Sequence, residues 1–438
     1  MEDFIHLHVH TQYSILDGQS RIPRLVDKAI ADGMKGMAIT DHGVMFGIKE
    51  LCDYCAKVNK GRKKEGLEPF KPIIGCEMYV AHRRKEDREK DKGDMSGYHL
   101  IVLAKNYNGY KNLIKLGSNS WVDGYYMRPR TDRADLEKYH EDLIVCSACI
   151  AGEVPRKILN GDIEGAREAC EWYHRVFGDD YYLELQRHKA TVPRANHEAY
   201  PLQQKANAKL LEYAKKYGIK VICSNDVHFV DEENAEAHDR LICLSTGKDL
   251  DDPSRMLYTK QEWMKTREEM NELFADVPEA LSNTLELLDK VEYYSIDHAP
   301  IMPTFAIPED FGTEEEYRQK FTEKDLYDEF TQDEHGNVVL SEEDGKAKIK
   351  RLGGYDKLYR IKLEGDYLAK LAFDGAKRIY GEPLTEEVKE RMNFELYIMK
   401  TMGFPGYFLI VQDFINAARK ELGVSVGPGR GSAAGSAV

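Results

Sequence analysis

Short apolar runs recur along the first half of the chain and alternate with segments of helical periodicity. The runs have the length typical of buried strands. They comprise Phe4–Val9, Gly36–Ile39, Pro72–Val80, His99–Ala104, Leu143–Cys146, Tyr181–Leu185 and Lys220–Cys223. The amphipathic segments between them include Ile22–Ala31, Gly109–Leu116, Ile163–Val176 and Pro201–Tyr217. The alternation predicts an α/β fold with a parallel sheet, and seven strands without an evident switch point favour a barrel.

Two charged segments interrupt this pattern and are expected to be solvated surface insertions. Residues Arg83–Gly97 form a dense mixed-charge loop. Residues 323–367 are also highly charged, and His335-Gly336-Asn337 within them suits the turn of a hairpin. A run of charges usually marks a solvated face, which is the interpretation adopted for both segments.

A change of composition near residue 300 predicts a domain boundary. Pro300, Pro303 and Pro308 punctuate a stretch that resists regular structure. Helical periodicity returns in Thr385–Leu422. The sequence therefore predicts a barrel domain over residues 1–285, a linker over 286–310 and a second domain over 311–438, with the charged insertion near 323–367.

Composition narrows the classes of protein that fit. The chain has 438 residues, a formal net charge of -14 and 42% hydrophobic residues, as a soluble globular protein does. Neither a signal peptide nor an apolar run long enough to cross a membrane is evident, so we expect a cytoplasmic protein without a membrane partner. The acidic balance argues against a protein that coats DNA nonspecifically, but it leaves room for a nucleic-acid enzyme with a local basic groove.

Eight cysteines are present, and they do not form a zinc ribbon. Cys52/Cys55 and Cys146/Cys149 are both C-x-x-C pairs. A ribbon places its two pairs ~15–20 residues apart, and these pairs lie roughly ninety apart. Cys52 and Cys55 fall in a helical pattern and are expected to be structural thiols, with no disulfides in the chain.

Metal-competent side chains recur at or near the ends of the predicted strands. His8 and His10 lie two apart on a strand, so both side chains point to one face and can clamp a metal. The full set is His8, His10, Asp17, His42, Glu77, His99, Cys149, Asp226 and His228. Most follow the carboxyl end of a strand, where barrel chemistry resides, whereas Glu77 and His99 fit less well and indicate a distorted barrel. Histidine and cysteine ligands favour Zn²⁺ or Mn²⁺ over Mg²⁺, and Cys149 favours zinc.

These residues resemble the motifs of the polymerase and histidinol phosphatase (PHP) family. The motifs are His8-x-His10-Thr11, Thr40-Asp41-His42-Gly43, Gly75-Cys76-Glu77, His99, Cys149 and Asn225-Asp226-x-His228. The resemblance implies a distorted (βα)7 barrel that holds three divalent metals and hydrolyses phosphoesters. It assigns the first metal to His8, His10, Glu77 and Asp226, the second to Glu77, His99 and Cys149, and the third to Asp17, His42 and His228. Two cations joined by a carboxylate suit an in-line displacement at phosphorus, and the residues expected to carry catalysis are Glu77, Asp226, His10 and His228.

Other polar residues are predicted to support this site. Asp41 is expected to orient a ligating imidazole, and His6 is expected to belong to the core. The run Tyr125–Arg130 interleaves aromatic residues with Arg128 and Arg130, as a nucleic-acid contact does. Together with His188, which follows the sixth strand, these two arginines are the predicted substrate contacts.

A glycine-rich loop near the end of the chain predicts an anion cradle. Met402–Val411 leads into a helix, and Val424–Val426 has the pattern of a short strand. The strand precedes Gly427-Pro428-Gly429-Arg430-Gly431-Ser432, and a strand, a glycine-rich turn and a helix start direct backbone N–H groups at an anion. The predicted nucleotide-binding residues are Gly429, Arg430, Gly431 and Ser432. The loop is not a Walker loop, because no Gly-Lys-Ser/Thr follows.

The stretches Met402–Val411 and Val426–Ser436 resemble the first part of the palm of the bacterial C-family replicative DNA polymerases, whose amino-terminal domain is a PHP domain. The resemblance implies an incomplete α/β palm of the nucleotidyltransferase type, in which Gly431 and Ser432 handle the triphosphate of a dNTP. It also implies DNA primer–template, Mg²⁺ for polymerisation, and a sliding clamp and a proofreading exonuclease as partners. The polymerase aspartates of that family lie beyond this loop, so a chain that stops at Val438 is expected to be a fragment unable to polymerise DNA.

Three hypotheses for the barrel follow. The leading one is a metal-dependent 3′–5′ exonuclease that proofreads for a polymerase. The second is a catalytically silent barrel that is stabilised by metals and docks a separate proofreading exonuclease. The third is a small-molecule phosphatase, against which the palm-like carboxyl-terminal region argues.

Overall fold

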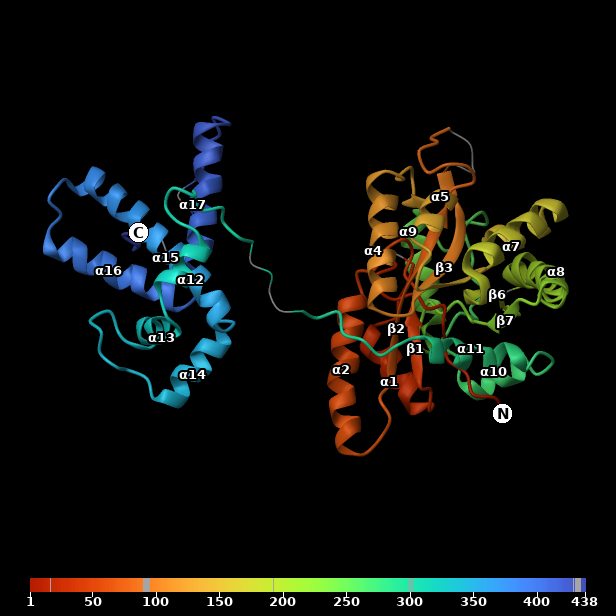
Figure 1. The fold of residues 1–438 in the computed structure, drawn as a ribbon. Coiled ribbons are helices and arrows are strands. Elements are labelled where there is room, and N and C mark those ends of the chain that lie inside the picture. The colour runs from red at the N-terminus through yellow and green to blue at the C-terminus, as the bar shows by residue number, and fades with distance from the viewer. Residues whose placement is uncertain are drawn as a thin grey trace. The chain divides into compact units, whose positions relative to one another are not determined.

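The computed structural model divides the chain into two compact units, Met1–His298 and Ala299–Val438 (Figure 1). It describes residues 1–15, 17–89, 95–191, 193–298, 301, 303–427, 429 and 435–438, with the backbone alone for 193–198. None of the helices in the described part of the chain is long and apolar enough to span a membrane.

A curled, seven-stranded sheet forms the centre of the first unit. Its strands are β1 (Gly36–Ile39), β2 (Lys71–Val80), β3 (Tyr98–Ala104), β4 (Arg130–Thr131), β5 (Leu143–Cys146), β6 (Tyr181–Leu185) and β7 (Lys220–Cys223). The order is β1-β2-β3-β5-β6-β7, and β4 pairs with β2 beside this path. All pairings are parallel except those of β3, which runs antiparallel to both β2 and β5. The prediction of an all-parallel sheet is therefore wrong at β3.

The first predicted strand, Phe4–Val9, is not a regular strand, yet it closes the curled sheet. On one side, the backbone N–H of Ala38 in β1 donates to the carbonyl of His6 at 2.9 Å. On the other side, the N–H of His10 donates to the carbonyl of Val227, just past β7, at 2.7 Å. The segment thus lies between the first and last strands, and the expected distorted barrel is confirmed.

Helices cover the outside of the sheet in the first unit. The helices of this unit are α1 (Ile22–Ala31), α2 (Ile48–Lys64), α4 (Tyr107–Val122), α5 (Arg133–Lys138), α6 (Glu153–Leu159), α7 (Ile163–Phe177), α8 (Pro193–Tyr217), α9 (Ala235–Thr246), α10 (Arg267–Leu273) and α11 (Glu279–Lys290), of which α1, α2, α4, α6, α7, α8 and α11 contact strands. Helix α4 packs on β3, α8 on β6 and α11 on β7 (Figure 1). Helix α8 begins at Pro193, earlier than predicted. The prediction placed the start at Pro201, because proline suits the first turn of a helix, but Pro201 lies inside α8.

The second unit consists of helices in the residues that the structure describes. They are α12 (Glu314–Lys320), α13 (Glu323–Thr331), α14 (Glu342–Arg351), α15 (Tyr355–Tyr380), α16 (Glu386–Thr401) and α17 (Pro405–Lys420). A single bridge between Gln332 and Val338 closes the turn that contains His335. The strand predicted for Val424–Val426 is wrong, because no neighbouring strand among the described residues offers the ladder that a strand requires.

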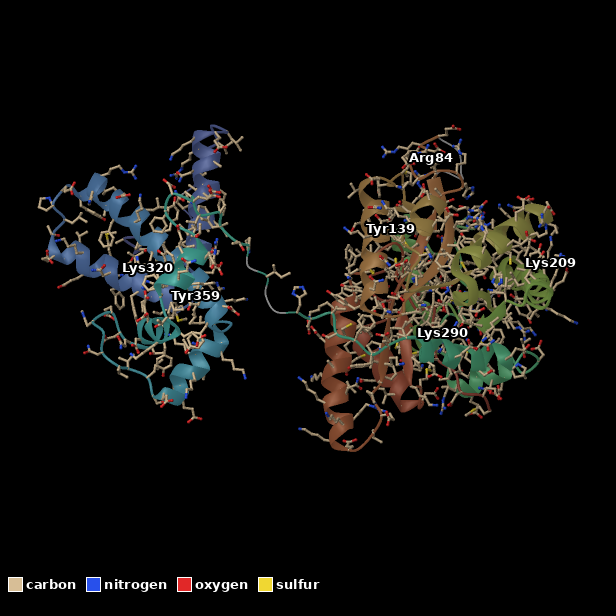
Figure 2. All side chains as sticks on the ribbon, in the orientation of Figure 1. Arg84, Tyr139, Lys209, Lys290, Lys320 and Tyr359 are labelled. Atoms are coloured by element: carbon tan, nitrogen blue, oxygen red, sulfur yellow. The ribbon has the colours of Figure 1, made fainter. Side chains whose placement is uncertain are left out.

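The charged segment 323–367 is not a purely solvated insertion. Its apolar residues form a small core of their own, made of Leu326, Phe330, Ile349, Leu358, Tyr359 and Ile361. Figure 2 shows Tyr359 among the side chains of this unit. The expectation failed because the charges dominate the composition, while the few apolar residues recur at helical intervals and pack across α13, α14 and α15.

Candidate metal centre

The structure brings the predicted metal ligands together at one end of the curled sheet, and the reversed strand explains how. His99 lies near the start of β3, and because β3 is antiparallel, its start meets the carboxyl ends of its neighbours. Glu77 lies within β2, but β1 ends at Ile39, which pairs with Ile74, so Glu77 lies beyond the end of β1. Glu77 and His99 did not fit the expectation that the ligands follow the carboxyl ends of the strands. The structure nevertheless places both at the same edge of the sheet as the other ligands.

The first group of ligand atoms belongs to His8, His10 and Asp226. Asp226 Oδ1 lies 3.1 Å from His8 Nε2 and 3.3 Å from His10 Nε2, and the two Nε2 atoms lie 3.2 Å apart. Both imidazoles therefore direct the same ring nitrogen to one point beside a carboxylate. This is the arrangement that a strand with histidines at alternate positions provides.

The second group belongs to Glu77, His99 and Cys149. His99 Nδ1 lies 2.8 Å from Glu77 Oε1 and 3.8 Å from Cys149 Sγ. Glu77 Oε1 also lies 3.4 Å from His8 Nε2. Glu77 is thus placed between the first and second groups, where its two oxygens can face different cations.

The third group contains His10, His42 and His228. Asp17 lies beside it, with Oδ2 2.6 Å from His42 Nε2 and Oδ1 3.7 Å from His228 Nε2. The resemblance to the PHP family assigns Asp17, rather than His10, to this group. In the structure His10 stands between the first and third groups, with its ring centroid 4.0 Å from that of His42.

Buried polar atoms in this cluster lack the hydrogen bonds that burial normally demands. Glu77 Oε2 and His42 Nδ1 lie 2.5 Å apart, yet among the described residues neither atom has a partner with the geometry of a hydrogen bond. Asp226 Oδ1, despite its two close imidazoles, is likewise without a partner of that geometry in the described part of the chain. These atoms approach one another without alignment of a donor and an acceptor, as ligand atoms around a shared cation do, so the residues fit a multinuclear metal site.

The carboxylates of the cluster are held in the charged form by the histidines. Burial opposes the charge of Glu77, but His99 and His42 outweigh it and hold the pKa of Glu77 well below its ordinary value. Burial likewise opposes the charge of Asp226, and His8 leads the groups that lower its pKa. Cations at this position would take over that role from the protonated histidines.

The imidazoles of the cluster differ in the direction in which their pKa values are shifted. Burial and the nearby His42 and His228 lower the pKa of His10 to about 3, so the ring nitrogen is free to bind a metal at neutral pH. Burial alone would lower the pKa of His228, but Asp17 and Asp226 outweigh it and raise it to about 9. Binding a metal through His228 therefore requires the release of a proton.

Two non-glycine residues at the site adopt left-handed backbone conformations. Ala148, just before Cys149, has φ 60°, and Asp226 has φ 47°. Such conformations cost ~1–3 kcal/mol each and persist where surrounding contacts impose them. Their position after β5 and β7 aims the Cys149 and Asp226 side chains into the cluster.

Glu184 on β6 was missed by the sequence analysis, and the structure places it behind His8. Its Oε1 accepts from His8 Nδ1 at 2.7 Å and from Gln186 Nε2 at 3.1 Å, and Ser224 Oγ donates to it as well. The side chain is buried, and within the described ranges of the chain no hydrogen-bond partner faces its Oε2. A carboxylate behind an imidazole fixes the tautomer that presents Nε2 to a metal. In the sequence Glu184 is one polar residue in an apolar run, which gives no signal of this role.

Removal of the Glu184 carboxylate is expected to weaken metal binding about 10- to 100-fold, the usual cost of losing such a partner. Glu184→Gln retains an acceptor for His8 Nδ1 and is expected to fall between wild type and Glu184→Ala. Titration of the metal-free protein with Zn²⁺ measures the effect. Glu168→Ala, on the exposed face of α7, is the matched control. Equal affinities for all four proteins would contradict the role.

Asp41 orients an imidazole through an intermediary. Its carboxylate accepts from Ser14 Oγ at 2.8 Å, and Ser14 Oγ lies 3.0 Å from His10 Nδ1. It also accepts from the Thr11 backbone N–H at 2.6 Å.

His6, by contrast, lies outside the ligand groups and faces the carbonyl of Lys265 at 2.8 Å, within the core.

Tyr258 is a second residue that sequence reasoning missed. Its hydroxyl donates to Asp17 Oδ1 at 2.9 Å and lies 3.3 Å from His228 Nε2. Burial, reinforced by Asp17, raises the pKa of Tyr258 well above its ordinary value, so the hydroxyl stays a donor. It lies in the loop between α9 and α10, where no motif or periodicity marks it.

The three predicted substrate contacts differ in their surroundings. Arg130 is fully buried and donates to the backbone carbonyls of Lys85, Asp87 and Gly124. His188 is also buried, with Nε2 3.1 Å from the Asn225 carbonyl and Nδ1 3.1 Å from Gln203 Nε2. These contacts give both side chains structural roles and do not support a direct contact with substrate.

Arg128 remains accessible beside the metal cluster. It is exposed, and its guanidinium carbon lies 5.7 Å from the centroid of the Tyr79 ring. The same ring lies 5.2 Å from the ring of His99 and 6.3 Å from the ring of His42. A cation at this position can meet a phosphate that approaches the cluster.

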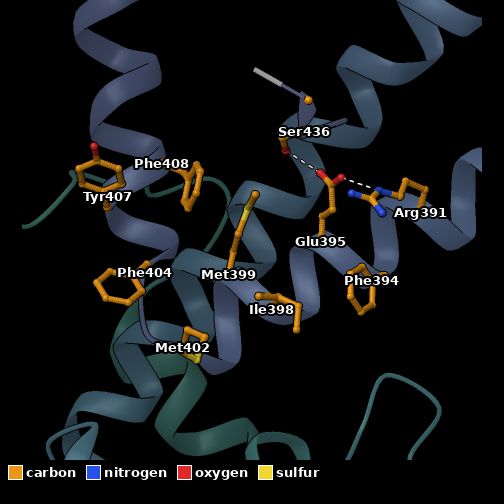
Figure 3. A pocket seen from close by; sticks show the side chains of 11 residues that line it. Arg391, Phe394, Glu395, Ile398, Met399, Met402, Phe404, Tyr407, Phe408 and Ser436 are labelled. Carbon is orange, nitrogen blue, oxygen red and sulfur yellow. Dashed lines mark hydrogen bonds and ion pairs between the residues drawn. The ribbon is translucent and has the colours of Figure 1, made fainter. Parts of the chain in front are cut away.

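The predicted nucleotide-binding loop lies mostly outside the described residues. Gly429 is described and has φ 76°, a conformation that favours glycine, whereas Arg430, Gly431 and Ser432 are among those not described. Beyond them, Ser436 Oγ donates to the Glu395 carboxylate at 2.5 Å and the Ala437 N–H donates at 2.8 Å. Figure 3 shows Ser436 and Arg391 on either side of Glu395, at the edge of an apolar pocket lined by α16 and α17.

Two family models match the chain. Residues 6–188 match the PHP domain, and residues 366–438 match the bacterial DNA polymerase III alpha NTPase domain. The first unit therefore carries a PHP domain, the class of domain that its fold and its histidine-rich cluster define. The carboxyl-terminal part of the chain is similar to the corresponding domain of DNA polymerase III alpha subunits.

Relatives with that name match along the whole chain. The DNA polymerase III subunit alpha of Borreliella burgdorferi is 39% identical over 99% of this chain and 32% of its own length. That of Treponema pallidum is 35% identical over 99% of this chain and 31% of its own length. The chain thus spans about a third of the length of these curated relatives.

A solved structure with a partly similar fold is histidinol phosphate phosphatase from Lactococcus lactis, in complex with Zn, L-histidinol and phosphate. It is 14% identical in sequence, with a TM-score of 0.26, over 60% of this chain and 100% of its own.

Proposed function

We propose that the first unit is a metal-dependent 3′–5′ exonuclease that hydrolyses the terminal phosphodiester of a DNA strand. The observation that carries the proposal is the cluster of three ligand groups, joined by Glu77 and His10, whose buried oxygens have close neighbours but no partner of hydrogen-bond geometry among the described residues. Three divalent cations, of which zinc suits the histidine and cysteine donors best, would polarise the phosphate and supply a nucleophile near neutral pH.

The side chains of this chain perform the remaining tasks. His8, His10 and Asp226 would hold one cation, Glu77, His99 and Cys149 a second, and His42 and His228, with Asp17 or His10, a third. Glu184 and Asp41 position two of the imidazoles, and Tyr258 holds Asp17. Arg128, at the exposed rim, would bind a nonbridging phosphate oxygen of the substrate.

We propose in addition that residues 311–438 belong to the palm of a DNA-directed DNA polymerase, after a PHP domain at 1–285 and a linker at 286–310. In the longer protein this palm would bind primer–template, and its loop at Gly429–Ser432 the triphosphate of a dNTP, with Mg²⁺. The match of residues 366–438 to the polymerase III alpha model supports this proposal. The proofreading role of the first unit follows from the same context, as do replisome partners such as a sliding clamp.

The exonuclease proposal predicts release of mononucleotides from a labelled primer with a mismatched 3′ end when Zn²⁺ or Mn²⁺ is supplied. Glu77→Ala and His8→Ala are each expected to lower the rate at least about a hundredfold, because each removes a ligand that positions reacting charge. Product analysis by gel and mass spectrometry gives the rate and the direction of digestion.

His140→Ala is the matched control, because His140 lies outside the three ligand groups. Circular dichroism establishes that each variant is folded. Absence of mononucleotides with either metal, or release that survives both ligand substitutions, would refute the proposal. Hydrolysis of a small phosphate ester without any effect on DNA would favour a small-molecule phosphatase instead.

A further inference from the structure

Two aromatic side chains lie stacked on the surface beside the metal cluster. The rings of Trp121, at the end of α4, and Tyr125 have centroids 5.4 Å apart and planes within 19° of parallel. Each side chain is 47% exposed. Large aromatic residues are usually buried, so a stacked and half-exposed pair is a surface prepared for another flat molecule.

This pair is attached directly to the metal site. Trp121 Nε1 donates to the carbonyl of Gly43 at 2.8 Å, and Gly43 follows the ligand His42. A Cβ on Gly43 would lie 2.7 Å from Pro129 Cγ and 3.3 Å from the Tyr79 ring, so the loop after Tyr125 packs tightly on this residue. A molecule stacked on the aromatic pair therefore lies next to the ligand cluster.

Hydrogen bonds and a cation–π contact hold the loop over residues 124–130. Buried Arg130 ties it to three backbone carbonyls, and its guanidinium lies 5.6 Å from the Tyr126 ring. The Tyr126 N–H donates to the Arg128 carbonyl at 3.0 Å, which closes a turn around Met127, whose φ is 62°. Because these contacts hold the turn, Arg128 is kept over Tyr79 and Tyr125 is kept against Trp121.

We propose that Trp121, Tyr125 and Arg128 form a subsite for single-stranded nucleic acid, with a base stacked on the aromatic pair and a backbone phosphate on Arg128. The assignment rests on the phosphodiesterase function proposed above and names the part of the substrate that this rim holds. Stacking accepts any base and the arginine accepts any phosphate, so the subsite is indifferent to sequence. A small phosphate ester without a base would not need the aromatic pair.

The test measures binding rather than turnover. A fluorescent oligothymidylate of about twelve nucleotides is titrated with the full chain, and anisotropy reports the affinity. Tyr125→Ala is expected to weaken binding about tenfold, the loss of one base–aromatic contact. Arg128→Gln is expected to weaken binding and to reduce the slope of log affinity against log salt by about 0.7, the loss of one phosphate contact.

Two substitutions serve as controls. Tyr107→Ala removes another exposed tyrosine at the opposite end of α4, 41% exposed, and is expected to bind like wild type. Trp121→Phe retains a ring for stacking but loses the N–H that donates to the Gly43 carbonyl. It therefore separates the stacking contribution of Trp121 from its hydrogen bond to Gly43. Melting temperature and zinc content establish that each variant retains its fold and its metal site.

Equal affinities of wild type, Tyr125→Ala and Tyr107→Ala would overturn the subsite, even if the chain degrades DNA. A wild-type chain that does not bind the oligonucleotide would overturn it too. If Tyr125→Ala changes self-association in sedimentation velocity and not oligonucleotide affinity, the pair is a protein contact and the proposal fails. Binding that depends on Tyr125 without hydrolysis would sustain the subsite and refute the exonuclease.

Discussion

Removal of bound metal by a chelator is expected to lower the melting temperature of the first unit by roughly 10 °C. A ligand at a thousandfold excess over its dissociation constant contributes about 4 kcal/mol to stability, and each kcal/mol moves the melting temperature of a large domain by ~2–4 °C. The physical cause is the concentration of carboxylates at this site, where Glu77 is buried and Asp17 and Asp226 are partly buried. Without cations, these carboxylates depend on protonated histidines for compensation.

Differential scanning calorimetry of the zinc-loaded chain, with and without EDTA, measures this shift. The transition of the second unit is expected to stay where it is, since the proposed ligands all lie in the first unit. Glu77→Ala provides the matched comparison, because a chain without this ligand should already melt low and respond little to EDTA. A wild-type transition that EDTA leaves unchanged would show that the cluster does not hold metal.

Gly152→Ala is expected to destabilise the first unit by several kcal/mol and to remove zinc from the second ligand group. A Cβ at Gly152 would lie 2.0 Å from the backbone carbonyl oxygen of Ser147, which no side-chain rotation relieves. The Gly152 N–H donates to the Cys149 carbonyl at 2.8 Å, and Gly152 forms a bridge with His99. Two ligands of one group would therefore shift together.

Chemical denaturation gives the change in free energy of unfolding, and elemental analysis gives the loss of zinc. Gly61→Ala is the control, because Gly61 lies exposed within α2 and a Cβ there would meet no described atom within 4 Å apart from the backbone of its own helix. That substitution is expected to stabilise the chain by about 1 kcal/mol, the difference in helix propensity. If Gly152→Ala, like Gly61→Ala, neither lowers the free energy of unfolding nor removes zinc, then the close approach of Gly152 to Ser147 is not required for stability or for the second ligand group.

Strand positions were predictable from sequence because the strands are buried on both faces. Such strands appear as continuous apolar runs, and β1, β5, β6 and β7 have the predicted bounds. The direction of β3 was not predictable, since it depends on which strands pair and not on any local pattern. The irregular conformation of Val424–Val426 was also missed, because its two valines suit a strand but no strand among the described residues pairs with them.

For the site, the residues with a motif were predictable and their supporting partners were not. His8, His10 and Asp226 belong to recurring patterns at strand ends, and the structure places them within contact of one another. Glu184 and Tyr258 act through hydrogen bonds to those residues from distant parts of the chain. Their role depends on the three-dimensional arrangement, as do the burial of Arg130 and its hydrogen bonds to backbone carbonyls.

The closure of the sheet by the segment that contains His8 and His10 also determines when the site can form during synthesis. Val9 bridges to Val227, so more than two hundred residues separate the two sides of this seam. Until Asp226 and His228 leave the ribosome, the first histidines have one strand neighbour and an open edge. The amino-terminal segment is therefore the first part of the barrel to be made and the last to be completed, and the ligand groups that include Asp226 or His228 are complete only once the nascent chain has passed residue 228.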